Sequence, residues 1–166
     1  MIVTIKKGSH YSSGFSVGSL HTGITQMGFL TRFDESGLLL PGRLECDGDF
    51  NKLFGWSHGM HHTNSFRLGW KAIDTQIVDG KIVGTRYRIS AYAYMSGIRY
   101  IKGFATILPN ETHMMSISRN GSEVVFSCGS KVHVITYNGP TGWGYNLKPY
   151  YGGNCTAPQD IAISLV

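Results

Sequence analysis

Apolar and polar residues alternate along several short segments of this sequence, and turn-forming residues separate those segments. The alternation is clear in 65–71 (SFRLGWK) and in 87–96 (YRISAYAYMS). Successive side chains of a strand point to opposite faces, so each segment is predicted to be a strand with one buried face. Asn120 and Gly121 stand between two further segments of this kind. Such a pair is typical of a tight hairpin turn in which both residues take positive φ.

The same reading predicts strands along most of the chain. Charged residues make up only 15% of the sequence and 22 residues are glycine, a composition that suits a turn-rich β domain better than a helical bundle. No helical pattern exceeds about two turns. We therefore expect one domain, 1–166, with an all-β fold: an antiparallel two-sheet β-sandwich. The other predicted strands are 2–5, 15–17, 27–33, 38–40, 113–119, 123–128, 131–137, 143–151 (with Pro149 at an edge or bulge) and 160–166.

The segment 47–63 has no clear period and is expected to be a structured loop. Its histidines match no closed zinc site in their spacing. Its Asp-x-Asp-x-Asn run carries Lys52 where a calcium-binding EF-hand needs glycine. No metal and no other cofactor is therefore expected. Trp56 and His61 are instead predicted to pack within the loop or to border a binding groove.

The net charge of the sequence and its first residues indicate which partners and which cellular location to expect. The formal net charge is +5, which favours a polyanionic partner such as an acidic glycan. No run of basic residues forms a nucleic-acid-binding arm. The first residues do not form a signal peptide and no apolar stretch is long enough to span a bilayer. We therefore expect synthesis in the cytoplasm and no membrane insertion.

Three cysteines, Cys46, Cys128 and Cys155, cannot all pair within one chain. None belongs to a CxxC pair. Three reduced, partly buried thiols are the simplest expectation, and a single bridge remains an alternative.

Residues 65–166 resemble the concanavalin A-like jelly roll of laminin-G-type domains, legume lectins and several polysaccharide lyases. The resemblance lies in the strand 87–96, in the stretch from His113 to Gly121, and in the ending that joins Tyr150-Tyr151-Gly152-Gly153 to Asp160-Ile161-Ala162-Ile163. It implies a jelly-roll fold and a saccharide surface on one sheet. The whole sequence also resembles small uncharacterised proteins of gut bacteria and phages that carry blocks like NKLFGWS and HHTNSFRLGW.

A basic and aromatic face is predicted on the side of the sheet away from the core. Tyrosine rings can stack on sugars, and Arg and Lys can pair with carboxylate or sulfate groups. The alternative is a solvated polar face or a subunit interface. The candidate glycan- or partner-binding residues are Arg67, Lys71, Arg88, Tyr92, Tyr94, Asn146, Lys148 and Tyr150, with Trp56 and His61 from the loop.

The sequence offers little for hydrolysis. A glycosidase needs two carboxylates that face one groove, and no such pair lies along one predicted strand. A polysaccharide lyase needs a Tyr or His base and a group that neutralises a uronate carboxylate, which Arg67, Tyr92, Asn146 and Tyr150 can supply. The Gln-x-His and Tyr-Phe-Lys-x-Gly patterns of the alginate-lyase family are not intact here.

Nucleic-acid binding is not expected. Basic and aromatic residues interleave in 86–102, but strand alternation divides them between two faces. The sequence as a whole favours a non-enzymatic surface recognition or assembly module, with no catalytic residue, as an accessory protein of a phage or other particle that is homo-oligomeric or part of a larger assembly. Two alternatives are a soluble lectin-like protein and a polysaccharide lyase acting on uronate-containing glycans.

Overall fold

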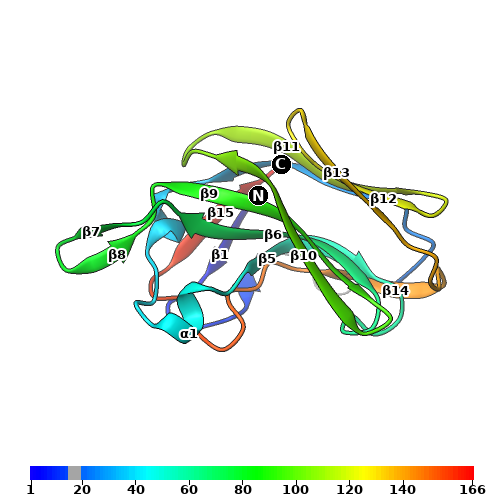
Figure 1. Ribbon diagram of the computed structural model, residues 1–166, viewed down its shortest axis with the longest axis horizontal. Helices are drawn as coiled ribbons and strands as arrows, with labels where there is room; N and C mark the ends of the chain where they lie inside the picture. The colour runs from blue at the N-terminus through cyan, green and yellow to red at the C-terminus, as the bar shows by residue number, and fades with distance from the viewer. Residues whose placement is uncertain (15–19) are drawn as a thin grey trace.

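The computed structural model describes residues 1–14 and 20–166, and in that part of the chain two antiparallel sheets pack against each other (Figure 1). The expected all-β, two-sheet β-sandwich is confirmed. The strand predicted at 15–17 lies outside the described residues. None of the helices in the described part is long and apolar enough to span a membrane.

The larger sheet has the order β13-β12-β11-β4-β15-β1-β2 among the described residues. Its strands alternate as the sequence predicts: Ile161, Ile163 and Leu165 point into the core, with Ala162 and Ser164 between them. Its members are β1 (Ile2–Ile5), β2 (Ser12–Ser13), β4 (Gln26–Phe33), β11 (Thr112–Asn120), β12 (Glu123–Cys128), β13 (Lys131–Thr136) and β15 (Ile161–Leu165).

The second sheet has the order β10-β9-β6-β5-β14-β3 within the described chain. Arg67 is central in it, opposite Tyr92 on one side and Gly55 on the other. A hairpin of β7 (Gln76–Val78) and β8 (Lys81–Val83) extends away from the body of the sandwich (Figure 1). The members of the second sheet are β3 (Leu20–Thr22), β5 (Asn51–Ser57), β6 (Ser65–Ile73), β9 (Arg86–Met95), β10 (Ile98–Ile107) and β14 (Trp143–Leu147).

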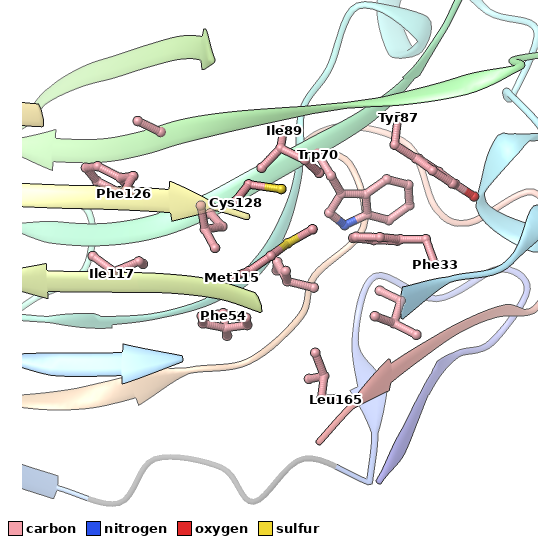
Figure 2. Close-up of a cluster of buried hydrophobic side chains, with 14 of the residues drawn as sticks. Phe33, Phe54, Trp70, Tyr87, Ile89, Met115, Ile117, Phe126, Cys128 and Leu165 are labelled. Atoms are coloured by element: carbon pink, nitrogen blue, oxygen red, sulfur yellow. The ribbon is translucent and has the colours of Figure 1, made fainter. Parts of the chain in front are cut away.

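The core between the sheets is rich in aromatic side chains. Figure 2 shows Phe33, Trp70 and Tyr87 together at one end of it, with the Phe33 and Trp70 ring centroids 5.2 Å apart. The hydroxyl of Tyr87 donates to the carbonyl oxygen of Asp34 at 2.6 Å, which satisfies the one polar atom of that ring. Full burial of a large apolar side chain contributes roughly 1.5–3 kcal/mol. This packing holds the second sheet against the first.

The segment expected to be a loop contains a strand, and this corrects the prediction for 47–63. Residues 51–57 form β5, which is buried along almost its whole length. A strand that is buried on both faces carries apolar residues on both, so its sequence lacks the alternation of apolar and polar residues. A register irregularity between Lys52 and Gly55 breaks the pattern further. The short helix α1 (Leu44–Asp47) precedes the strand.

Three local predictions also change. The hairpin between β11 and β12 exists, but Asn120 pairs with Glu123, so its turn residues are Gly121 and Ser122. Of these, Gly121 has φ +59°, and Asn120 does not take positive φ. The expected strand at 38–40 is reduced to an isolated β-bridge between Leu39 and Val83, after the 3-10 helix η1 (Glu35–Leu38), which Asp34 caps. The strand expected at 143–151 ends at Leu147, before Pro149.

A disulfide joins Cys46 to Cys155, whose Cα atoms are 5.7 Å apart. The expectation of three reduced thiols is therefore wrong for these two residues. Cys128 is a free, buried cysteine. The pairing could not be derived from the sequence because 109 residues separate the two partners.

Candidate functional site

A groove of about 650 Å³ lies over the outer face of the second sheet. Its floor comes from β6 and β9, where Arg67, Tyr92 and Tyr94 alternate with core residues. Its walls come from the turn after β5, from β14 and from the segment that follows β14. The lining residues are Tyr11, Lys52, His61, His62, Ser65, Arg67, Tyr92, Tyr94, Arg99, Tyr145, Asn146, Leu147, Lys148, Tyr150, Gly153 and Asn154.

Most of the candidate residues from the sequence lie together in this groove. Arg67, Tyr92, Tyr94, Asn146, Lys148, Tyr150 and His61 all line it. Lys71 and Arg88 do not. Lys71 places its Nζ 5.2 Å from the centre of the Phe50 ring, and Arg88 packs beside Gly103.

Trp56 is a core residue, which corrects its prediction as a groove residue. It is completely buried, and its Nε1 donates to His58 Nε2 at 3.4 Å. Trp56 lies on β5, which is buried on both faces. Its sequence therefore lacks the alternation of apolar and polar residues from which the orientation of Trp56 could have been predicted.

Arg67 is the central cation of the groove. Its Nη2 donates to the carbonyl oxygen of Lys148 at 2.5 Å, while its Nε is buried without a hydrogen-bond partner among the described residues. Burial lowers the pKa of the guanidinium to about 10, so Arg67 keeps its charge at neutral pH. The opposite residue, Gly55, must lack a side chain, since a Cβ there would lie 1.9 Å from the carbonyl oxygen of Phe66.

Lys52 is a second, half-buried cation that the sequence analysis missed because it lay in the expected loop. Its Nζ donates to the carbonyl oxygen of Gly152 at 2.7 Å. The same atom lies 5.2 Å from the ring centre of Tyr92 and 5.5 Å from that of Tyr150. Burial, followed by the charge of Arg67, lowers the pKa of Lys52 to about 8.

His61 and Tyr145 form a close polar pair at the opposite end of the groove. The Tyr145 hydroxyl lies 2.5 Å from His61 Nδ1 and accepts from the backbone N–H of His61 at 3.4 Å. Burial first, then the charges of His62 and Arg67, lower the pKa of His61. The imidazole is therefore neutral near pH 7 and can accept the phenolic proton. Tyr145 was missed because strand alternation placed its neighbour Asn146 outward, whereas both residues line the groove.

Tyr145 and Tyr150 lie on either side of Arg67 along the sheet. The backbone N–H of Tyr145 donates to the Ser57 side chain, at one end of β5, whereas Tyr150 pairs with Lys52 near the other end. Gly55, opposite Arg67, lies between these two points of β5. Burial raises the pKa of Tyr150, so its hydroxyl stays protonated and can donate.

The groove is cationic and has no carboxylate in its described lining. Asp49 lies just behind it, with Oδ2 accepting from the backbone N–H groups of Gly153 and Asn154 at 3.0 and 3.3 Å. Across residues 1–14 and 20–166, no three His, Cys, Asp or Glu side chains gather as a metal site. The arrangement suits an anionic ligand with sugar rings, whose apolar faces can pack on the flat tyrosine rings of the lining.

No protein-family model and no curated protein sequence matches this chain. The resemblance to small gut-bacterial and phage proteins is therefore unsupported, and so are the expected particle and oligomer partners. The jelly-roll, concanavalin A-like expectation is supported by solved structures.

Two solved structures share the fold over 99% of this chain. One is the catalytic domain of an endo-1,3-beta-glucanase (laminarinase) from Thermotoga petrophila, with 11% identity, a TM-score of 0.52 and 73% of its chain covered. The other is a GH16 protein of the mixed-linkage glucan PUL of Bacteroides ovatus, solved with its G4G4G3G product, with 10% identity, a TM-score of 0.52 and 80% covered. An alginate lyase from an Alteromonas species reaches a TM-score of 0.49 at 9% identity, covering 85% of this chain and 68% of its own.

These comparisons correct the main functional expectation. The chain was expected to be a non-enzymatic recognition or assembly module, but two of the structures that share its fold are a glucanase catalytic domain and a GH16 protein bound to its product. At 10–11% identity this likeness shows the fold and not the reaction. The reaction has to be argued from the groove.

Proposed function

We propose that this protein is a polysaccharide lyase that cleaves uronate-containing glycans by β-elimination. The observation that carries the proposal is the lining of the groove, where the half-buried Arg67 lies between a His61–Tyr145 pair and Tyr150 and no described lining residue is Asp or Glu. β-Elimination needs a cation for the uronate carboxylate, a base and a proton donor. Each of these groups is present in the groove.

The reaction balances with the chain's own residues. Arg67 binds the uronate carboxylate and stabilises the charge that develops when the adjacent C5–H bond breaks. Tyr145 takes that proton after its own phenolic proton has passed to the neutral His61. The C4–O bond breaks as the C4=C5 double bond forms, and the Tyr150 hydroxyl gives its proton to the leaving oxygen. His61⁺ then releases its extra proton to solvent, and Tyr150 regains a proton from solvent, which resets the site.

Hydrolysis of a neutral glucan fits this groove poorly. Glycosidases of the usual kind place two carboxylates on the two sides of the scissile bond, about 5–5.5 Å or 6.5–9.5 Å apart. Asp49, whose carboxylate lies behind the wall of the groove, is engaged there with two backbone N–H groups. The fold is shared with glucan-acting proteins, but the described side chains favour a different substrate and reaction.

The test incubates the purified protein with two acidic polysaccharides, polygalacturonate and alginate, and with two neutral ones, laminarin and mixed-linkage β-glucan. We expect ultraviolet absorbance from a new C4=C5 double bond with an acidic polysaccharide, together with an equal number of new reducing ends. Tyr145→Phe should slow the appearance of both signals by about 10²- to 10⁴-fold.

Three results would overturn the proposal. New reducing ends without the ultraviolet signal would show hydrolysis. Retardation of the protein in gels cast with an acidic polysaccharide, with no cleavage, would show a lectin. Neither binding nor cleavage of the acidic polysaccharides would remove uronate glycans as the ligand class.

A further inference from the structure

Residues 46–52 are bonded at several points to the segment 152–155, which forms one end of the groove. Asn51 Oδ1 accepts from the backbone N–H of Gly152 at 2.6 Å, and Lys52 Nζ donates to the carbonyl oxygen of the same glycine at 2.7 Å. Asp49 Oδ2 accepts from the next two backbone N–H groups, at 3.0 and 3.3 Å. The disulfide between Cys46 and Cys155 adds a covalent link between the same two segments.

Asp49 approaches this backbone closely because residue 153 is glycine. A Cβ at Gly153 would lie 2.8 Å from Asp49 Oδ2. Both Gly153 and Asn154 line the groove, while Asp49 does not. The carboxylate thus shapes the groove wall from behind without lining it.

Asp49 also compensates the charge of Lys52. The ionised groups that act on the Lys52 ammonium are Arg67 and Arg99, which disfavour its charge, and Asp49, which favours it. The other titratable groups that face it, Tyr92 and Tyr150, present their neutral rings. Asp49 is therefore the carboxylate that helps Lys52 to remain a cation in a groove with two neighbouring guanidinium groups.

We propose that Asp49 is a positioning residue of the groove: by holding the 153–154 backbone and by keeping Lys52 charged, it maintains a second anion-binding point next to Arg67. This inference rests on the proposed action on acidic glycans. It reverses the simple expectation that removal of a negative charge near a cationic groove strengthens the binding of anions.

The two roles of Asp49 separate by pH. The pKa of Lys52 is about 8, so Lys52 is charged at pH 6 and loses its charge above pH 8. Asp49→Asn lowers this pKa further, because the favourable charge has gone. Loss of the hydrogen bonds from Asp49 to the 153–154 backbone weakens glycan binding at every pH. Loss of the positive charge on Lys52 weakens glycan binding selectively near and above pH 8.

The experiment measures the dissociation constants of polygalacturonate and alginate oligomers at about pH 6 and about pH 8.5, in a Tyr145→Phe background that prevents cleavage. We expect Asp49→Asn to weaken binding about threefold more at the higher pH than at the lower one, as expected when a pKa falls by roughly half a unit. Lys52→Arg should flatten the pH dependence, and Asp49→Asn/Lys52→Arg should stay flat, because arginine remains charged throughout this range.

Asp47→Asn is the matched control, because this nearby carboxylate accepts from the backbone N–H of Gly42 instead. It should leave the pH dependence unchanged. If Asp49→Asn weakened glycan binding equally at both pH values, without rescue by Lys52→Arg, Asp49 would have only a structural role. That result would overturn this inference but not the proposed function. Absence of binding of both glycans by the Tyr145→Phe protein and by the unaltered protein would overturn the proposed function as well.

Discussion

The Arg67 guanidinium donates a hydrogen bond from Nη2 to the carbonyl oxygen of Lys148, and this contact joins the floor of the groove to its wall. The two residues are 81 positions apart: Arg67 lies on β6, and Lys148 directly follows the last residue of β14. The bond fixes the guanidinium plane in the groove. A rigid cation of this kind can meet a carboxylate without reorganisation when the ligand arrives.

Arg67→Lys should therefore cost activity although it keeps the charge. The ammonium of lysine cannot hold the carbonyl of Lys148 and form a two-point contact with a carboxylate at once. We expect kcat/KM on an acidic polysaccharide to fall about a hundredfold, as on removal of one preorganised donor. Circular dichroism and thermal unfolding should show that the fold is kept. Activity within a factor of about three of the unaltered protein would contradict this role for Arg67.

Tyr145→Phe removes the hydroxyl that contacts His61. We expect kcat to fall by about 10²- to 10⁴-fold, while the affinity for the glycan changes little, because the ring and the cations of the groove remain. Single-turnover kinetics with a binding assay separate the two quantities. Tyr100→Phe is a matched control, since Tyr100 also contacts a histidine, His133, at 2.8 Å, but outside the groove. A similar loss in both variants would point to a structural effect.

The sequence was sufficient to predict the sandwich and much of the groove because both depend on a period of two. Strand β9 has its core residues and its groove residues where the alternation places them, with Ile89 and Ala91 inside and Tyr94 outside. This alternation can be read within one strand, without knowing which strands are its neighbours. It predicts the face of the sheet on which each side chain lies. Outward-facing residues of several strands then lie close together when those strands belong to one sheet.

The predictions failed where a residue's environment depends on distant chain segments. Lys52 and Trp56 lie on β5, which is covered on both faces and carries no alternation. Tyr145 meets His61 through a separation of 84 residues, and the Cys46–Cys155 pair spans 109. Such contacts are set by the topology of the sheets, which local sequence patterns do not encode.

The Cys46–Cys155 disulfide should contribute strongly to stability. Its closure of a loop of about 110 residues restricts the unfolded chain, and removal of a native disulfide typically costs about 2–5 kcal/mol. We expect Cys46→Ser/Cys155→Ser to lower the free energy of unfolding by this amount in urea denaturation. A reducing agent should produce the same decrease in the unaltered protein and none in the double variant. Equal stability of the three samples would show that the bond does not form in solution.

Acid should destabilise the fold through His58. This side chain is only 2% exposed, accepts a hydrogen bond from Trp56 Nε1, and packs near Tyr137. Burial, with a smaller contribution from the charge of Arg119, lowers its pKa below the ordinary 6.5. The folded state therefore favours the neutral imidazole. Its contribution to stability is complete above pH 6.5 and is lost as the pH falls toward and below the folded pKa.

His58→Gln keeps an acceptor for Trp56 but removes the titrating group. We expect the unaltered protein to lose stability below about pH 6.5 with a slope from this histidine of at most about 1.4 kcal/mol per pH unit. The slope should be smaller in His58→Gln by that contribution. Urea denaturation at several pH values measures it. The same slope in His58→Gln as in the unaltered protein would exclude His58 as the group responsible.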